Sequence, residues 1–233
     1  MILLETNDGR PHLEQVLPVL RAGKPVFIDN PIAGSLADAV AIFQAAGSTR
    51  SRCSVPLPAL GQEQPGGTGR KHGVVKAVRN HQSVFAREDT PGPVLVWHPR
   101  CRVAVHRDEG RCQTVTRKKS TDALEVVEGT WKGGRIGIFT GTRPGKGYSG
   151  KAEGSKGNAA VGSYDGYAPL VVDIVRFFRT GKSSIPERET IEIYAFMEAA
   201  DESKRQGGKP VTIESVLAKA RKQAAKRLAE LDK

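Results

Sequence analysis

Two short apolar runs near the start of the chain are each followed by polar residues that could contact a ligand. Residues 7–10 follow the run 2–6, and Asp29-Asn30-Pro31 follows the run 25–28. If both runs are parallel strands, their carboxyl ends meet at one edge of the sheet, where ligands of such sheets bind. We therefore expect a ligand site at these two ends, which are Thr6–Arg10 and Asp29–Pro31.

Other candidate chemistry is sparse. The sequence contains no G-x-G-x-x-G, G-x-S-x-G or H-E-x-x-H motif, and its three cysteines form no CxxC pair. We therefore expect no metal site and a reducing, cytoplasmic location. The glycine-rich residues 142–163 lack the spacing of a phosphate loop, which favours a surface loop. Single histidines are more often packed or exposed than catalytic, and the five here are scattered: His12, His72, His81, His98 and His106.

The elements that would position the two polar stretches alternate over residues 2–47, which predicts parallel βαβ units. Apolar residues recur at helical spacing from Leu13 to Leu20, and Gly23 follows where a helix would end. Ser35 and Asp38 have the spacing of a capping box and open a second helix, which we expect to end at Gly47.

Regular patterning is lost in the middle of the chain and returns at Cys112. Residues 48–73 have the composition of a linker, residues 74–78 could form a strand, and residues 79–111 show no sustained period. Beyond them we expect a strand over 113–117, a hairpin around Lys132-Gly133-Gly134, and three helices. The helices are expected to cover residues 170–180, to start after Pro186, and to start after Thr212.

The formal net charge of +11 invites a nucleic-acid function. The basic excess lies in residues 50–111 and 202–233, while aromatic residues make up 6% of the chain and no recognition motif occurs. We therefore expect no nucleic-acid partner. We also expect no membrane partner, because no apolar run approaches the ~20 residues of a membrane-spanning helix. No signal peptide is evident at the N-terminus, which begins almost directly on a strand, and we expect that residues are missing upstream.

The arrangement of these motifs resembles the Gfo/Idh/MocA family, which includes glucose-fructose oxidoreductase and inositol dehydrogenase. Asn7 and His12, followed by AGKPVFIDNPIAGSLADA, resemble the family's His-opened helix and its A-G-K-x-V-x-x-E-K-P motif. Residues 112–222, including TWKGGRIGIFTGTR and RFFRTGKSSIPERETIEIYAFMEAADESKRQGGKPV, look like members typical of planctomycete-type bacteria.

The resemblance implies an NAD(P)-dependent oxidoreductase that acts on a sugar, polyol or sugar acid, a carbohydrate-like small molecule. It implies NAD or NADP as cofactor, bound near Asn7, His12, Asp29, Asn30 and Pro31, and a homo-oligomer. The implied fold is α/β plus α+β: a partial Rossmann-like unit, then a mixed or antiparallel sheet domain with C-terminal helices. We expect boundaries at 1–48 for the nucleotide-binding half, 49–111 for an irregular segment, and 112–233 for the second domain.

The sequence departs from the family pattern in three places. The first strand–helix unit with its glycine fingerprint is absent, so we expect weak cofactor binding. Asn30 occupies the position of the family's catalytic lysine and cannot lower the pKa of a substrate hydroxyl by charge. The catalytic histidine cannot be identified. We hypothesise that residues 50–70 and 79–110 are translated out of frame, in which case His98 and His106 are not that residue.

Two functions remain open from the sequence. The chain is either an oxidoreductase by descent, impaired or inactive in this form, or a non-catalytic remnant that acts at most as an oligomerisation or binding domain.

Overall fold

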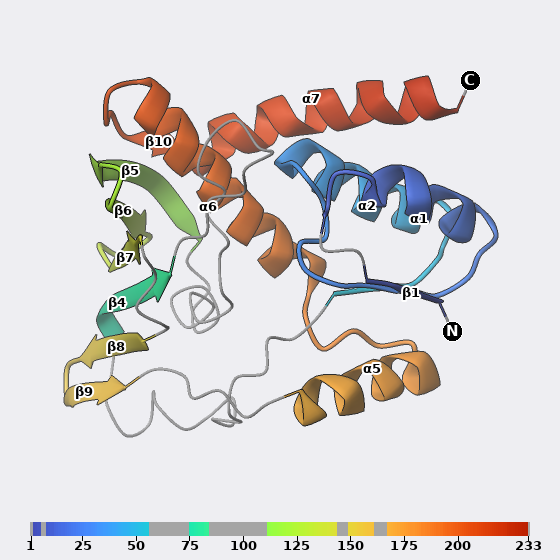
Figure 1. Ribbon diagram of the computed structural model, residues 1–233, viewed down its shortest axis with the longest axis horizontal. Coiled ribbons are helices and arrows are strands. Elements are labelled where there is room, and N and C mark those ends of the chain that lie inside the picture. Colours follow the sequence, from blue (N-terminus) through green and yellow to red (C-terminus); the bar gives the residue numbers. More distant parts are fainter. Residues whose placement is uncertain are drawn as a thin grey trace. The chain divides into compact units, whose positions relative to one another are not determined.

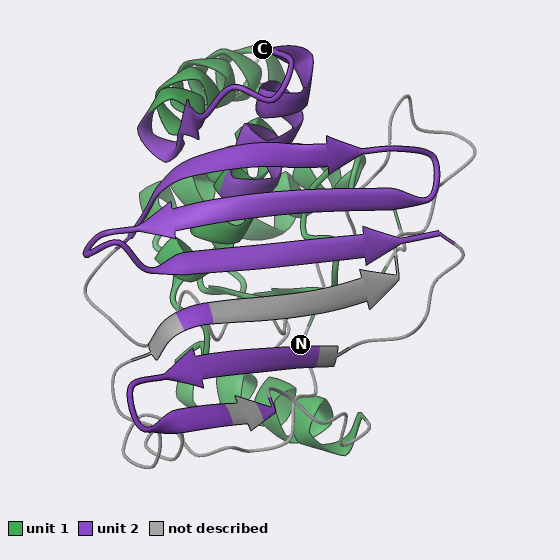
Figure 2. Cartoon of the chain, turned by 90° about the vertical axis from the view of Figure 1, so that its left-hand side faces the viewer, with its two compact units in different colours: residues 1–59, 165–195, 215–233 green, residues 60–164, 196–214 purple. Residues whose placement is uncertain are grey.

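The computed structural model describes residues 2–5, 8–55, 75–83, 111–143, 149–160 and 167–232. Most of the two stretches hypothesised to be out of frame, with His98 and His106, lies outside the described residues. The chain divides into two compact units, shown in different colours in Figure 2. Unit 1 comprises residues 1–59, 165–195 and 215–233, and unit 2 comprises residues 60–164 and 196–214. The domain boundaries expected from the sequence stay predictions.

Unit 1 is built on a parallel sheet with the order β1-β2-β3. The strands are β1 (Ile2–Leu4), β2 (Val26–Ile28) and β3 (Cys53–Ser54), and β2 is buried along its whole length. Helices α1 (His12–Arg21) and α2 (Leu36–Ser48) connect them and lie against each other (Figure 1). The predicted βαβ alternation is confirmed.

Local sequence signals account for the limits of these two helices. Gly23 adopts φ +67° just after α1, a conformation that glycine takes without strain. Ser35 Oγ accepts a hydrogen bond from the Asp38 N–H at 3.0 Å and so caps α2. The Asp38 carboxylate accepts from the Ser35 hydroxyl at 2.9 Å, so the capping box differs from the standard reciprocal form. The helix also continues through Gly47, which was expected to end it.

The three C-terminal helices predicted from the sequence are confirmed. They are α5 (Ala168–Thr180), α6 (Glu187–Arg205), which contributes residues to both units, and α7 (Ile213–Leu231). Gly181 ends α5 with φ +68°. The apolar positions of α7 within unit 1 are turned inward, as is typical of a helix docked on its own domain. Val216, Leu217, Ala220 and Ala224 are buried, and Leu228 and Leu231 are half-buried. In the part of the chain that the structure describes, no helix is long and apolar enough to cross a membrane.

Unit 2 contains a seven-stranded mixed sheet with the order β10-β5-β6-β7-β4-β8-β9. Its neighbouring strands are antiparallel except β4 and β7, which are parallel. The strands are β4 (Val75–Ser83), β5 (Cys112–Ser120), β6 (Leu124–Trp131), β7 (Ile136–Thr142), β8 (Ser149–Gly154), β9 (Gly157–Ala160) and β10 (Val211–Thr212). The chain therefore has the α/β plus α+β fold class predicted from the sequence, and the β6–β7 hairpin turns at Gly133 and Gly134 as expected.

Two stretches expected to be irregular contain strands. Strand β4 continues to Ser83, and residues 149–160 of the glycine-rich stretch form the β8–β9 hairpin instead of a surface loop. Strand β4 and the β8–β9 hairpin pair with each other, because β8 lies between β4 and β9 in the sheet. Pairing with neighbours decides strand formation more strongly than the low intrinsic propensity of glycine does.

The second half of α6 packs on one face of this sheet. Trp131 of β6 stacks on Phe196 of α6 with ring centroids 6.1 Å apart. A Cβ added to Gly129 or Gly137 would lie within 2.7 Å of an aromatic ring atom, so both positions require glycine. The predicted hairpin thus carries glycines that make room for an aromatic core.

Candidate functional site

The predicted ligand-binding turn directly follows β2 in unit 1. The Asp29 N–H donates to the Leu4 carbonyl oxygen at 2.8 Å, so the strand pairing extends to the first residue of the turn. Asp29 and Pro31 are half-buried, Asn30 is exposed, and the peptide bond between Asn30 and Pro31 is cis. The carboxyl ends of β1 and β2 therefore lie side by side, and the turn presents Asn30 to solvent at this edge.

The loop after β1 packs tightly against the loop after β2. A Cβ on Gly9 would lie 2.6 Å from the carbonyl carbon of Ala33 and 2.8 Å from the Pro31 oxygen. A Cβ on Gly34 would lie 2.9 Å from Cα of Arg10. No side chain fits at either glycine unless the backbone shifts, so the two loops form one packed edge. The predicted residue Asn7 lies outside the described residues.

His12 lies behind this edge as the first residue of α1. Its side chain is fully buried, and Nδ1 lies 3.2 Å from the carbonyl oxygen of Ile32. A carbonyl oxygen only accepts hydrogen bonds, so this contact assigns the ring proton to Nδ1. His12 therefore holds the backbone of the loop after β2, and its role in cofactor binding stays a prediction.

Tyr194 of α6 holds the same loop through its hydroxyl group. The Ala33 N–H donates to the hydroxyl oxygen at 3.2 Å, and the hydroxyl donates to the Ala33 carbonyl oxygen at 3.1 Å. Desolvation by burial raises the pKa of Tyr194 to about 12. Sequence reasoning missed this residue because 161 positions separate it from Ala33 and no local motif marks it.

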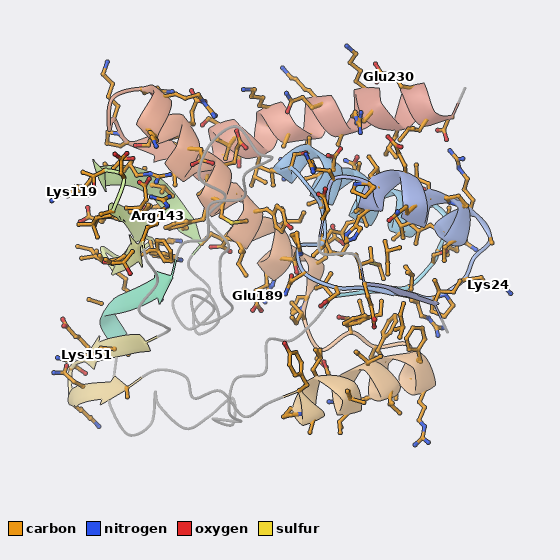
Figure 3. The ribbon with its side chains drawn as sticks, viewed as in Figure 1. Lys24, Lys119, Arg143, Lys151, Glu189 and Glu230 are labelled. Carbon is orange, nitrogen blue, oxygen red and sulfur yellow. The ribbon has the colours of Figure 1, made fainter. Side chains whose placement is uncertain are left out.

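The described part of the edge contains no lysine; the correspondence of Asn30 to the family's lysine stays a prediction. Lys24 precedes β2 and so lies at the amino end of the strand, and Figure 3 shows its exposed side chain pointing away from unit 1. Arg10 lies on the edge, but its guanidinium is paired with Asp8, with Nε 2.8 Å and Nη2 2.5 Å from Oδ2. Asn30 thus offers hydrogen bonds without a positive charge.

The helix starts beside this edge are poorly suited to a pyrophosphate. Helix N-termini bind phosphate through free backbone N–H groups and their partial positive charge. At α2 the Asp38 N–H is already bonded to Ser35, and the Asp38 carboxylate adds negative charge to the first turn. At α1 the first turn contains Glu14, and the His12 N–H points to the Gly9 oxygen at 3.3 Å. An anion would meet a carboxylate at both starts.

Unit 2 contains a second cluster of charged residues, which the sequence did not reveal. Arg117 and Glu125, 2% and 1% exposed, form a pair at 2.5 Å, and Arg117 also lies 2.7 Å from Asp201 on α6. Burial raises the pKa of Asp201, opposed by Arg117. Arg143, labelled in Figure 3, lies 3.7 Å from the Glu125 carboxylate. Because the charges of this cluster pair with one another, we assign the cluster a structural role.

No group of three or more His, Cys, Asp or Glu side chains that could hold a metal ion occurs among the residues that the structure describes.

No family model matches the chain, and no curated protein matches its sequence. Solved structures do match its fold. GenD2 from gentamicin A biosynthesis, in complex with NAD, is 16% identical with a TM-score of 0.73, over 90% of this chain and 77% of that one. The scyllo-inositol dehydrogenase of Lactobacillus casei, with bound NAD(H) and scyllo-inositol, is 12% identical with a TM-score of 0.70, over 91% and 80%.

The WlbA dehydrogenase of Bordetella pertussis, in complex with NADH and UDP-GlcNAcA, is 17% identical with a TM-score of 0.68, over 90% of this chain and 78% of that one. At these identities the likeness shows the fold. The chain shares the fold of these dehydrogenases, and other solved structures that it resembles are also dehydrogenases and oxidoreductases.

Proposed function

We propose that this chain is an NAD(P)-linked oxidoreductase of the Gfo/Idh/MocA kind, acting on a sugar, polyol or sugar acid, and that its catalysis is impaired. The observation that carries the proposal is the Asp29-Asn30-Pro31 turn at the carboxyl end of β2, within a fold shared with NAD-bound dehydrogenases. Asp29 and the exposed Asn30 lie where a polar ligand can reach them.

The residues at this edge fit the nicotinamide half of the cofactor better than its pyrophosphate. When bound, the nicotinamide supplies hydride transfer with a substrate carbon. Asn30 would donate hydrogen bonds to the substrate hydroxyl or the nicotinamide ribose. It carries no charge, so it cannot lower the pKa of the hydroxyl as a nearby cation would. Loss of the hydroxyl proton is therefore poorly supported, which accounts for the impairment.

The helix starts support weak binding of the adenosine half. Glu14 and Asp38 place carboxylates in the first turns of α1 and α2, where a pyrophosphate would need free N–H groups. The adenosine and its phosphate should therefore add little affinity to what the nicotinamide ribotide contributes.

The test compares NADH with reduced nicotinamide mononucleotide, titrated by fluorescence and by saturation-transfer NMR. We expect both compounds to bind weakly. Their dissociation constants should agree within about threefold, because contacts to the adenosine half, which only NADH has, should contribute under ~1 kcal/mol. Saturation transfer should reach the nicotinamide protons and not the adenine protons. Tight, saturable NADH binding with adenine transfer would contradict the impairment. If neither the nicotinamide ring nor the adenine ring receives saturation transfer, the proposed function is contradicted.

A charge substitution tests the role of Asn30. Asn30→Lys should strengthen binding of the reduced mononucleotide, because the ammonium is attracted to its phosphate. Gln44→Lys adds the same charge on an exposed position of α2 and serves as the matched control. Equal effects of both variants would show that net charge alone acts, and would remove Asn30 from the site.

A partly exposed apolar face of the unit 2 sheet, as seen among the described residues, supports the accompanying proposal of a homo-oligomer. Ile136 is 39% exposed, and Leu124, Val126 and Ile138, which share its side of the sheet by strand alternation, are half-buried. A second copy could cover this face. Sedimentation should give a mass above that of one chain, and Ile136→Lys should lower it; a monomer at all concentrations would contradict the proposal.

A further inference from the structure

We propose that Tyr194 is a positioning residue that fixes the loop after β2 and thereby the placement of the Asp29–Pro31 turn. The proposal rests on the proposed function in that the turn is the ligand-binding element. The contact itself is independent of any ligand. Tyr194 comes from α6 and lies 161 residues after Ala33 in the sequence, so its part in the site is visible only in the folded chain.

The geometry satisfies a buried residue completely. Ala33 is 3% exposed, so its backbone N–H and carbonyl cannot rely on bulk water. One tyrosine hydroxyl can donate one hydrogen bond and accept others. Tyr194 does both toward Ala33, accepting from the N–H at 3.2 Å and donating to the oxygen at 3.1 Å. It thereby replaces two backbone partners with a single side chain.

The loop after β2 has further contacts with the segment that follows β1. His12 Nδ1 lies 3.2 Å from the Ile32 oxygen, and the backbone at Gly9 approaches Ala33 so closely that no Cβ would fit. Ile32 and Ala33 are therefore held through backbone atoms by residues from two remote segments. Because Pro31 precedes them directly, a shift of Ala33 would move the turn that carries Asn30.

Only a hydroxyl that keeps its proton can make both bonds. Burial raises the pKa of Tyr194 to about 12, so the donor is present throughout the neutral range. Phenylalanine preserves the ring but leaves the Ala33 N–H and carbonyl without this partner. The cost of two buried unpaired backbone groups should appear as local opening of the loop.

The experiment measures amide hydrogen exchange of the full chain without ligand, comparing Tyr194→Phe with the parent. Tyr167→Phe is the matched control, since Tyr167 is 71% exposed at the start of α5. We expect exchange at Ala33 and its neighbours in residues 30–34 to accelerate about tenfold or more in Tyr194→Phe. Residues 26–28 of β2 and the helix α7 should be unchanged, and Tyr167→Phe should match the parent throughout.

Unchanged exchange at residues 30–34 overturns the proposal. Acceleration of β2 and α7 to the same extent also overturns it, because the hydroxyl would then stabilise unit 1 as a whole. A second readout is the dissociation constant of reduced nicotinamide mononucleotide, which should rise severalfold in Tyr194→Phe while the unfolding midpoint stays close to that of Tyr167→Phe. If the parent chain binds no nucleotide, the proposed function fails, while the exchange data still decide the role of Tyr194.

Discussion

The buried ion pair of unit 2 offers a sharp test of the packing between α6 and the sheet. We predict that Glu125→Gln lowers the free energy of unfolding by about 3 kcal/mol, the lower end of the range for breaking a buried pair. Glu125 is 1% exposed and its Oε2 lies 2.5 Å from Arg117 Nη1, while Oε1 accepts from the Ser120 hydroxyl at 3.0 Å. The amide removes the charge but keeps the shape.

The magnitude follows from what Arg117 retains in the variant. Its guanidinium, 2% exposed, still lies 2.7 Å from the Asp201 carboxylate and donates through Nε to the Ala200 oxygen at 3.3 Å. Asp201 is itself 40% exposed, so solvent screens this remaining attraction. Of the two carboxylates that compensate the charge of Arg117, the variant loses the buried one, Glu125, and keeps the more exposed one, Asp201.

Glu128→Gln is the matched control on the same strand. Its carboxylate, 27% exposed, pairs with Lys118 at 3.0 Å, and such partly solvated pairs contribute about 0–1 kcal/mol. Urea unfolding followed by far-UV circular dichroism measures both variants. Equal costs, within about 0.5 kcal/mol, would refute the reasoning that burial makes the Arg117–Glu125 pair the stronger one. A variant in which Arg117→Met accompanies Glu125→Leu should recover much of the loss, because a well-packed apolar pair often replaces a buried ion pair.

Two further predictions concern unit 1. Gly9→Ala should destabilise the fold by about 1–3 kcal/mol, since its Cβ would overlap Ala33. Gly47→Ala, in open space within α2, should instead stabilise the fold by up to about 1 kcal/mol. Thermal unfolding measures both variants, and a change of stability in the same direction for both would contradict the close approach of the two loops. Burial raises the pKa of Cys53 from 9.0 and of Tyr194 from 10.0 to about 12, so the native state retains both protons longer than the unfolded state. Stability from these groups is therefore fully present below pH 9 and is lost as the pH rises toward 12. Cys53→Ala should remove the part that begins near pH 9, and identical pH profiles for the variant and the parent would rule out a contribution of the Cys53 thiol.

Much of the local structure could be predicted from residue patterns. The apolar spacing of α1, the capping serine of α2 and the glycines after α1, α5 and β6 act over a few residues, and the structure has these elements where the patterns place them. The glycine-rich stretch 149–160 could not be predicted in this way. Its strands form because β4 pairs with β8, and no local sequence pattern near β8 identifies β4 as the partner strand.

The candidate site shows the same division. The sequence by itself determined that a polar turn with Asn30 follows a buried strand, and that no lysine occupies its place, because strand ends and side-chain chemistry are local properties. Only the tertiary structure decided that His12, Gly9 and Tyr194 converge on Ile32 and Ala33. Backbone groups of a buried loop must find partners wherever the folded chain provides them, and here the partner hydroxyl comes from 161 residues away.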